Sequence, residues 1–234
     1  MSIQNRIYVE KRFCGPPDSG NGGYVCGRLA KYVTGIAEVR LMKPPPLEKD
    51  LAVSVQDDGS VLLIDGDIVI AKATPSSLDL EVPAPPALDE AADASTRYIC
   101  AEDHFFPTCF VCGPKRKLRD GLRIFPGPLE GRGVVASPWT PDDTLLDEGG
   151  EIGSEFIWAS LDCPGAFAVI GSCVRPVVLG SLTAVIMKKP SSGQPCITMG
   201  WEIESQGRKR FAGTALCTRE GEILAKAKAV WIEI

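Results

Sequence analysis

The residues with the clearest chemical potential in this chain are Asn21-Gly22-Gly23 and Asp162. Apolar periodicity predicts a helix that begins at about Gly22, with Asn21 as its N-cap. The first backbone N–H groups of a helix have no partner within it, and the helix dipole favours negative charge there. Glycine also lets a ligand approach the backbone closely. Gly22 and Gly23 could therefore hold a developing oxyanion, although a glycine-rich turn that only redirects the chain has the same sequence.

Asp162 is the strongest candidate for an acid–base or nucleophilic group. It lies in an apolar, helix-like stretch, residues 156–165, which Pro164 interrupts. Burial among apolar neighbours and the dipole at a helix C-terminus both disfavour a charged carboxylate, so we expect a raised pKa for Asp162. The alternative is an aspartate that only caps or hydrogen-bonds a helix end.

Cysteine and histidine positions suggest a second kind of site. Cys100, His104, Cys109 and Cys112 have a spacing that could hold a structural zinc ion. The alternative, a packed loop with a buried histidine, is favoured, so we predict no metal and no other cofactor. The nine cysteines, an odd number in a chain without an apolar leader, indicate mostly reduced and buried thiols.

Composition and charge exclude several classes of protein. The 234 residues carry a net charge of −5 with scattered basic residues, which argues against a nucleic-acid partner. One short basic run, residues 115–119, is interpreted as a solvated loop, and the alternative is an anion site for a phosphate-bearing ligand. No apolar run approaches the ~20 residues that span a bilayer. We therefore expect a cytoplasmic protein with no membrane partner.

The elements that must position these residues occur twice. Residues 35–44 are echoed by residues 181–190, and residues 65–73 by residues 220–229. Each pair of echoes follows a helix-like stretch that opens near glycines. Two copies of one helix-then-strands unit predict a domain duplicated within the chain.

Each copy is expected to contain one helix followed by antiparallel strands. For the first copy the sequence predicts a helix over 22–33 and strands at 6–12, 36–43, 51–57, 60–64 and 67–74. For the second copy it predicts a helix from about Ser154 and strands at 122–126, 132–137, 181–189, 196–204, 209–218 and 222–233. Residues 75–96, rich in Pro, Ala, Ser and Asp, are predicted to be a linker. The expected domain boundaries are 1–88, 89–120 for the connecting loop, and 121–234.

Two motifs resemble those of a known family. Cys109-Phe-Val-Cys-Gly-Pro114 with Gly121-Leu-Arg-Ile-Phe125 looks like the Cys-x-x-Cys-Gly … Gly-Leu lead-in of many hotdog-fold acyl-CoA thioesterases. Asn21-Gly-Gly-Tyr24 looks like the His-Gly-Gly opening of the hotdog helix in the PaaI-like group, with asparagine replacing histidine. Together with the order of elements, the resemblance covers nearly the whole chain. It implies an α+β double hotdog, two tandem units related by a pseudo-twofold.

The resemblance also implies where a site would be assembled. In the PaaI-like group the catalytic acid lies on the hotdog helix two turns beyond the Gly-Gly, and one site is shared by two protomers. Seven residues beyond Gly23 is Ala30, whereas seven residues before Asp162 is Glu155. One complete site is therefore implied, the opening of the first helix with Asp162, and one decayed site, Ala30 with Glu155.

The implied activity is hydrolysis of acyl-CoA or a related acyl thioester between the two halves. Asp162 would activate water or attack the carbonyl, and we expect Ser19, Tyr24, Glu155 and Trp158 to contact substrate. The alternative is a non-catalytic protein of the same fold that binds acyl-CoA or lipid. A hotdog hydratase is disfavoured because the sole histidine is in the predicted loop. The resemblance also allows a homodimer.

Overall fold

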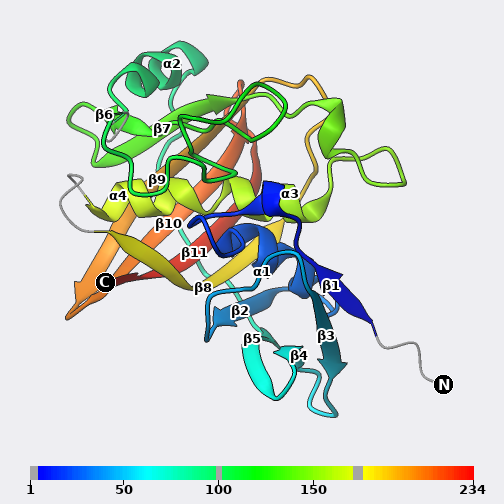
Figure 1. Cartoon of the computed structure of the whole chain (residues 1–234). Coiled ribbons are helices and arrows are strands. Elements are labelled where there is room, and N and C mark those ends of the chain that lie inside the picture. The colour runs from blue at the N-terminus through cyan, green and yellow to red at the C-terminus, as the bar shows by residue number, and fades with distance from the viewer. Residues whose placement is uncertain (1–4, 99–101, 171–175) are drawn as a thin grey trace.

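The computed structural model describes residues 5–98, 102–170 and 176–234. Its strands form one antiparallel sheet that runs through the molecule, and α1, α3 and α4 cross one side of it (Figure 1). The helices are α1 (Gly22–Ala30), α2 (Leu88–Thr96), α3 (Ser154–Ser160) and α4 (Cys163–Ile170). The strands are β1 (Arg6–Tyr8), β2 (Ala37–Leu41), β3 (Asp50–Val55), β4 (Val61–Asp65), β5 (Ile68–Pro75), β6 (Gly127–Leu129), β7 (Val134–Trp139), β8 (Val177–Ile186), β9 (Cys196–Gln206), β10 (Lys209–Thr218) and β11 (Ile223–Glu233).

The strand order shows how the first and second parts of the chain join. It runs β1-β3-β4-β5-β2-β8-β11-β10-β9-β7-β6. The two parts meet where β2 pairs antiparallel with β8, with Ala37 opposite Ala184 and Val39 opposite Leu182. Because this seam is hydrogen-bonded, the helices from both parts share one sheet and one core.

Small residues bring α1 and α3 into close contact under this sheet. A Cβ atom at Gly27 would lie 2.7 Å from both Glu155 Cα and Trp158 Cβ. At Gly23 it would lie 2.8 Å from the carbonyl oxygen of Trp158. The glycines of α1 therefore let the two helices approach each other closely.

Residues 75–96 are not all linker, because α2 occupies their last part. Its buried residues, Ala91 and Ala94, pack on the outer face of β6, β7 and β9 against Leu129 and Ile197. Glu90 in its first turn accepts a hydrogen bond from the backbone N–H of Ala87 at 2.7 Å. The alanine-rich composition concealed the apolar stripe, and α2 lies apart from the other helices (Figure 1).

Most other predicted elements are confirmed. The predicted turn at Gly66 has the positive φ of 58° that joins β4 to β5. Two predicted strands differ. The strand predicted at 6–12 ends at Tyr8 and is followed by a short 3₁₀ helix, Lys11–Phe13. The strand predicted at 122–126 is irregular, and the first strand of the second part is β6.

Within the described residues, none of the helices is both long and apolar enough to span a bilayer.

Candidate functional site

Asn21 is the N-cap of α1, as predicted, and is almost completely buried. Its Oδ1 accepts a hydrogen bond from the backbone N–H of Tyr24 at 2.9 Å, which satisfies one of the free donors of the first turn. Its own backbone N–H donates to the carbonyl oxygen of Phe13 at 2.8 Å. The side-chain amide is thereby fixed, which leaves its Nδ2 group to donate to Asp162.

Asp162 lies at the junction of α3 and α4, with only 2% of its surface exposed. The α3 carbonyl just before it, that of Leu161, accepts a hydrogen bond from Thr214 Oγ1 at 2.9 Å. Oδ2 of Asp162 accepts hydrogen bonds from Asn21 Nδ2 at 2.8 Å and from the backbone N–H of Gly23 at 3.0 Å. Its Oδ1 is buried without a hydrogen-bond partner among the described residues.

Burial raises the pKa of Asp162 to about 7, the direction expected from the sequence. The hydrogen bonds from Gly23 and Asn21 oppose this rise, and the nearby Cys109 adds to it. The dipole of α3 is a weaker cause than expected, because Asp162 also directly precedes α4 and its carboxylate binds the N-terminus of α1. A carboxyl group in this range can both accept and release a proton near neutrality.

A cavity of about 320 Å³ lies at this junction. Asn21, Gly22 and Asp162 contribute to its wall, together with Ser19. The rest of the wall is largely apolar and comes from β2, the loop before Cys112, α4, β8 and β11, including Leu41, Met42, Phe106, Phe167, Val177, Leu179 and Trp231. An apolar cavity with a few converging polar groups is typical of a small-molecule site.

Of the eight residues selected for catalysis or substrate binding, the structure places four in the cavity wall and four outside it. Ser19, Asn21, Gly22 and Asp162 line it. Gly23 is adjacent, and its N–H donates to Asp162 Oδ2 at 3.0 Å. Gly22 keeps the one N–H of this pair with no acceptor among the described residues.

Tyr24, Glu155 and Trp158 lie outside the cavity wall. The ring of Tyr24 stacks on Phe13 with centroids 4.3 Å apart, and its hydroxyl accepts from Arg28. Trp158 packs against α1, and Glu155 forms an ion pair with Lys31 at 2.6 Å. Tyr24 and Trp158 are buried in the core, and Glu155 lies at the N-terminal end of α3, so their contact with substrate stays a prediction.

Several wall residues were not selected from the sequence. Leu179 and Trp231 belong to strands of the second part, and the indole Nε1 of Trp231 is buried without a hydrogen-bond partner among the described residues. His104, which the sequence suggested as a zinc ligand, lines the cavity as well. The alternation in β11 indicated that Trp231 faces inward, but a pattern within one strand does not say which cavity it faces.

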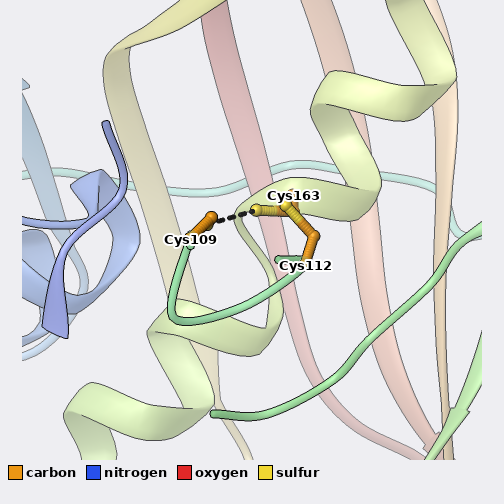
Figure 2. Close-up of side chains that lie close together, drawn as sticks. All are labelled: Cys109, Cys112 and Cys163. Atoms are coloured by element: carbon orange, nitrogen blue, oxygen red, sulfur yellow. Dashed lines mark hydrogen bonds between the residues drawn. The ribbon is translucent and has the colours of Figure 1, made fainter. Parts of the chain in front are cut away.

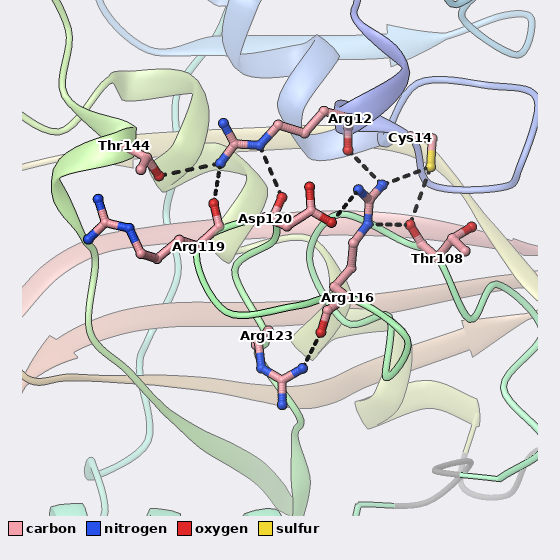
Figure 3. Close-up of polar contacts among 8 residues, drawn as sticks. All are labelled: Arg12, Cys14, Thr108, Arg116, Arg119, Asp120, Arg123 and Thr144. Atoms are coloured by element: carbon pink, nitrogen blue, oxygen red, sulfur yellow. Dashed lines mark hydrogen bonds and ion pairs between the residues drawn. The ribbon is translucent and has the colours of Figure 1, made fainter.

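Two arginines of the basic run at 115–119 already form hydrogen bonds and ion pairs within the protein (Figure 3). Arg116 donates to the carbonyl oxygens of Thr108 and Arg12, both at 2.7 Å, and pairs with Asp120 at 3.0 Å. Arg119 pairs with Asp143. These arginines tie the loop to the N-terminal segment, which weighs against an anion site formed by the whole run.

The structure describes three of the four residues that the sequence suggested as zinc ligands. Cys100 lies outside the described residues. His104 and Cys112 are in contact, with Nε2 and Sγ 3.4 Å apart, and Cys109 is buried close by.

Comparison with known proteins identifies the fold. No protein-family model matches the sequence, and no curated protein does. Among solved structures, acyl-CoA thioesterase II TesB2 from Mycobacterium marinum is 13% identical, with a TM-score of 0.62 over 98% of this chain and 92% of that one. A conserved protein of unknown function with a hot dog fold from Alicyclobacillus acidocaldarius is 9% identical, with a TM-score of 0.64 over 100% and 94%.

A tesB protein from Mycobacterium avium subs paratuberculosis is also similar, at 13% identity and a TM-score of 0.59 over 92% of this chain and 87% of that one. At these identities the likeness speaks for the fold. The resemblance inferred from the sequence is confirmed at that level: this chain has a hotdog fold like that of TesB-type thioesterases.

Proposed function

We propose that this protein hydrolyses an acyl thioester, with acyl-CoA as the substrate class, at the cavity between its two halves. The observation that carries the proposal is the carboxylate of Asp162. One of its oxygens is held by Asn21 and Gly23, and the other has no hydrogen-bond partner among the described residues. The residue contributes to the wall of a largely apolar cavity. A carboxylate fixed in this way is preorganised to act on a bound reactant.

We also propose that the halves are two hotdog units related by a pseudo-twofold. The alignment that matches Met42 with Met187 also matches Ala37 with Leu182 and Val39 with Ala184. A twofold would exchange the two seam pairs that these four residues form.

Backbone contacts next to the seam support the same relation. The N–H groups of Met42 and Lys43 both donate to Ile70, and those of Met187 and Lys188 both donate to Leu224. The strand order supports it as well, since each half continues from the seam as an antiparallel run.

The chemistry assigns one step to each group. Oδ1 of Asp162 takes a proton from a water molecule as the water oxygen bonds to the thioester carbonyl carbon. The N–H of Gly22, at the positive end of the α1 dipole, donates to the oxyanion that forms. When the oxyanion collapses, the carbon–sulfur bond breaks and the leaving thiolate receives the proton from Asp162. The products are a carboxylic acid and a thiol.

The experiment that tests the proposal is a hydrolysis screen over short, long and aromatic acyl-CoAs with wild type and Asp162→Asn. Asparagine keeps the shape of the side chain and an oxygen that can accept from Asn21 and Gly23. We expect wild-type turnover of at least one acyl class and a loss of orders of magnitude in the variant, with thioester binding retained.

The rival function, a non-catalytic acyl-CoA or lipid-binding protein, predicts a different result. Binding would then be measurable for both proteins by calorimetry, and neither would release thiol above the spontaneous rate. That outcome, or equal turnover by wild type and Asp162→Asn, would overturn the proposal.

A further inference from the structure

Three buried cysteines from distant parts of the sequence meet beside the cavity (Figure 2). Cys109 and Cys112 belong to the loop that precedes the second half, and Cys163 is the first residue of α4. Their Sγ atoms all lie within 4.8 Å of one another, and those of Cys109 and Cys163 are 3.8 Å apart. Each residue is no more than 6% exposed. The cluster adds a thiol from the second half, Cys163, to Cys109 and Cys112 of the sequence-based set.

The 3.8 Å separation of the Cys109 and Cys163 sulfurs matches a known metal geometry. Zinc binds thiolates at about 2.3 Å and prefers a tetrahedron, whose sulfur–sulfur edges are then about 3.8 Å. Soft thiolate ligands select zinc over magnesium or calcium. The Cys-x-x-Cys spacing of Cys109 and Cys112 is that of a common zinc-binding half-site.

His104 is in contact with the cluster, but in the orientation of a hydrogen-bond donor. Its Nδ1 accepts from the backbone N–H of Phe106 at 2.9 Å, so the neutral ring carries its proton on Nε2. Nε2 then faces Cys112 Sγ at 3.4 Å as an N–H group. A ring that bound a metal through Nε2 would need its proton on Nδ1, which faces a donor here.

Two neutral donors thus surround the thiols. His104 faces Cys112, and Nδ2 of Asn21 lies 3.9 Å from Cys109 Sγ. Such N–H groups offset the excess negative charge of three thiolates on a divalent cation. None of the three cysteines forms a disulfide with another described residue.

We propose that Cys109, Cys112 and Cys163 bind one Zn²⁺ ion as thiolates, with the fourth position filled by water from the cavity. His104 is a hydrogen-bond donor to the Cys112 thiolate. The ion would tie the loop at 109–112 to the start of α4, and so fix the backbone next to Asp162. This site does not depend on the proposed hydrolase activity.

Metal analysis of the full-length protein tests the proposal. The chain is purified under reducing conditions from zinc-supplemented cells, and its metal content is measured by mass spectrometry. We expect close to one zinc per chain in wild type and loss of most of it in Cys109→Ser and Cys163→Ser. Cys217→Ala, which changes a buried thiol in β10 away from the cluster, is the matched control and keeps its zinc.

A second measurement needs no variant and so does not depend on how the variants fold. Wild type is stripped with a chelator and titrated with Co²⁺ alone, and we expect thiolate-to-cobalt charge-transfer bands that saturate at one equivalent. Zinc-free wild type that binds neither added Zn²⁺ nor Co²⁺ would overturn the site, as would a native disulfide between Cys109 and either partner. Loss of zinc in His104→Ala would overturn the assignment of three thiolates without a histidine ligand.

Discussion

The two ends of the α1–α3 helix pair hold their carboxylates in opposite ways. At one end, Asp162 is bound by the uncharged donors of Asn21 and Gly23 and lines a cavity. At the other end, Glu155 is bound by Lys31 at 2.6 Å and lines no part of that cavity. A lysine offsets the charge of a carboxylate, whereas uncharged donors around a buried carboxylate leave its charge uncompensated. The difference indicates that one end is suited to chemistry and the other to stability.

Exchanging the two acids for amides should give the largest contrast. Asp162→Asn removes the proposed base, and we expect kcat/KM to fall by about 10²–10⁴-fold, the range for a general base. Glu155→Gln should leave kcat/KM close to the wild-type value, because Glu155 is not part of the wall of the cavity that Asp162 lines. Steady-state assays of thiol release measure both. Similar losses in the two variants would remove the distinction between the two ends.

Adding a methyl group at either glycine contact separates positioning from packing. At Gly23 the new Cβ would lie 2.6 Å from Asp162 Cβ, and at Gly27 it would lie 2.7 Å from Glu155 Cα. Both alanine variants should lose about 1–3 kcal/mol of unfolding free energy through overpacking. Only Gly23→Ala displaces the reacting carboxylate, so we expect its kcat to fall further, by about 10²-fold.

Denaturant titrations and single-turnover rates measure these two quantities. An equal fall in kcat for Gly23→Ala and Gly27→Ala would mean that general loosening of the helix pair, rather than the position of Asp162, controls turnover.

Two substitutions at Asn21 distinguish its role as a cap from its contact with Asp162. Serine keeps an acceptor for the N–H of Tyr24, and alanine does not; neither can reproduce the bond from Nδ2 to Asp162. We expect both to lower kcat by about 10-fold, the value of one hydrogen bond to a charged group. Only Asn21→Ala should also lose about 1 kcal/mol of stability.

Thermal unfolding and kcat, measured on the same preparations, separate these effects. If Asn21→Ser kept full turnover, Asn21 would be a helix cap and nothing more.

The sequence predicted more of the fold than of the site. Strand alternation and the repeats located nearly every strand, and the N-cap at Asn21 followed from local chemistry. The meeting of Asn21 with Asp162 followed from aligning the two helices by the family resemblance. Two contacts of the site could not be predicted, and both are long-range. One is the hydrogen bond from the Gly23 N–H to Asp162, and the other is the contact of Cys163 with Cys109. Neither leaves a pattern along the chain, because the partners are distant in sequence.

Helix α2 was missed for a different reason. Its apolar stripe consists mainly of alanines, which carry little hydrophobic signal, and it follows a run of prolines. The segment is helical because its alanine stripe covers the apolar outer face of β6, β7 and β9, a contact that the local sequence does not show. The expected homodimer, cytoplasmic location and domain boundaries stay predictions.

The repeats provide a final and smaller contrast in two lysines. Lys43 is exposed at the cavity and forms no ion pair among the described residues, whereas its counterpart Lys188 pairs with Glu222 at 3.2 Å. If the phosphates of acyl-CoA lie at the cavity mouth, Lys43→Ala should raise KM for acyl-CoA by up to about fivefold, the value of one exposed ion pair. Lys188→Ala should not.

An acyl thioester of a short thiol without phosphates is the control substrate, and its KM should be the same in all three proteins. Added salt should raise the wild-type KM for acyl-CoA toward that of Lys43→Ala, because exposed charges are screened. A Lys43→Ala effect that persisted with the phosphate-free substrate would place Lys43 in contact with the acyl group instead.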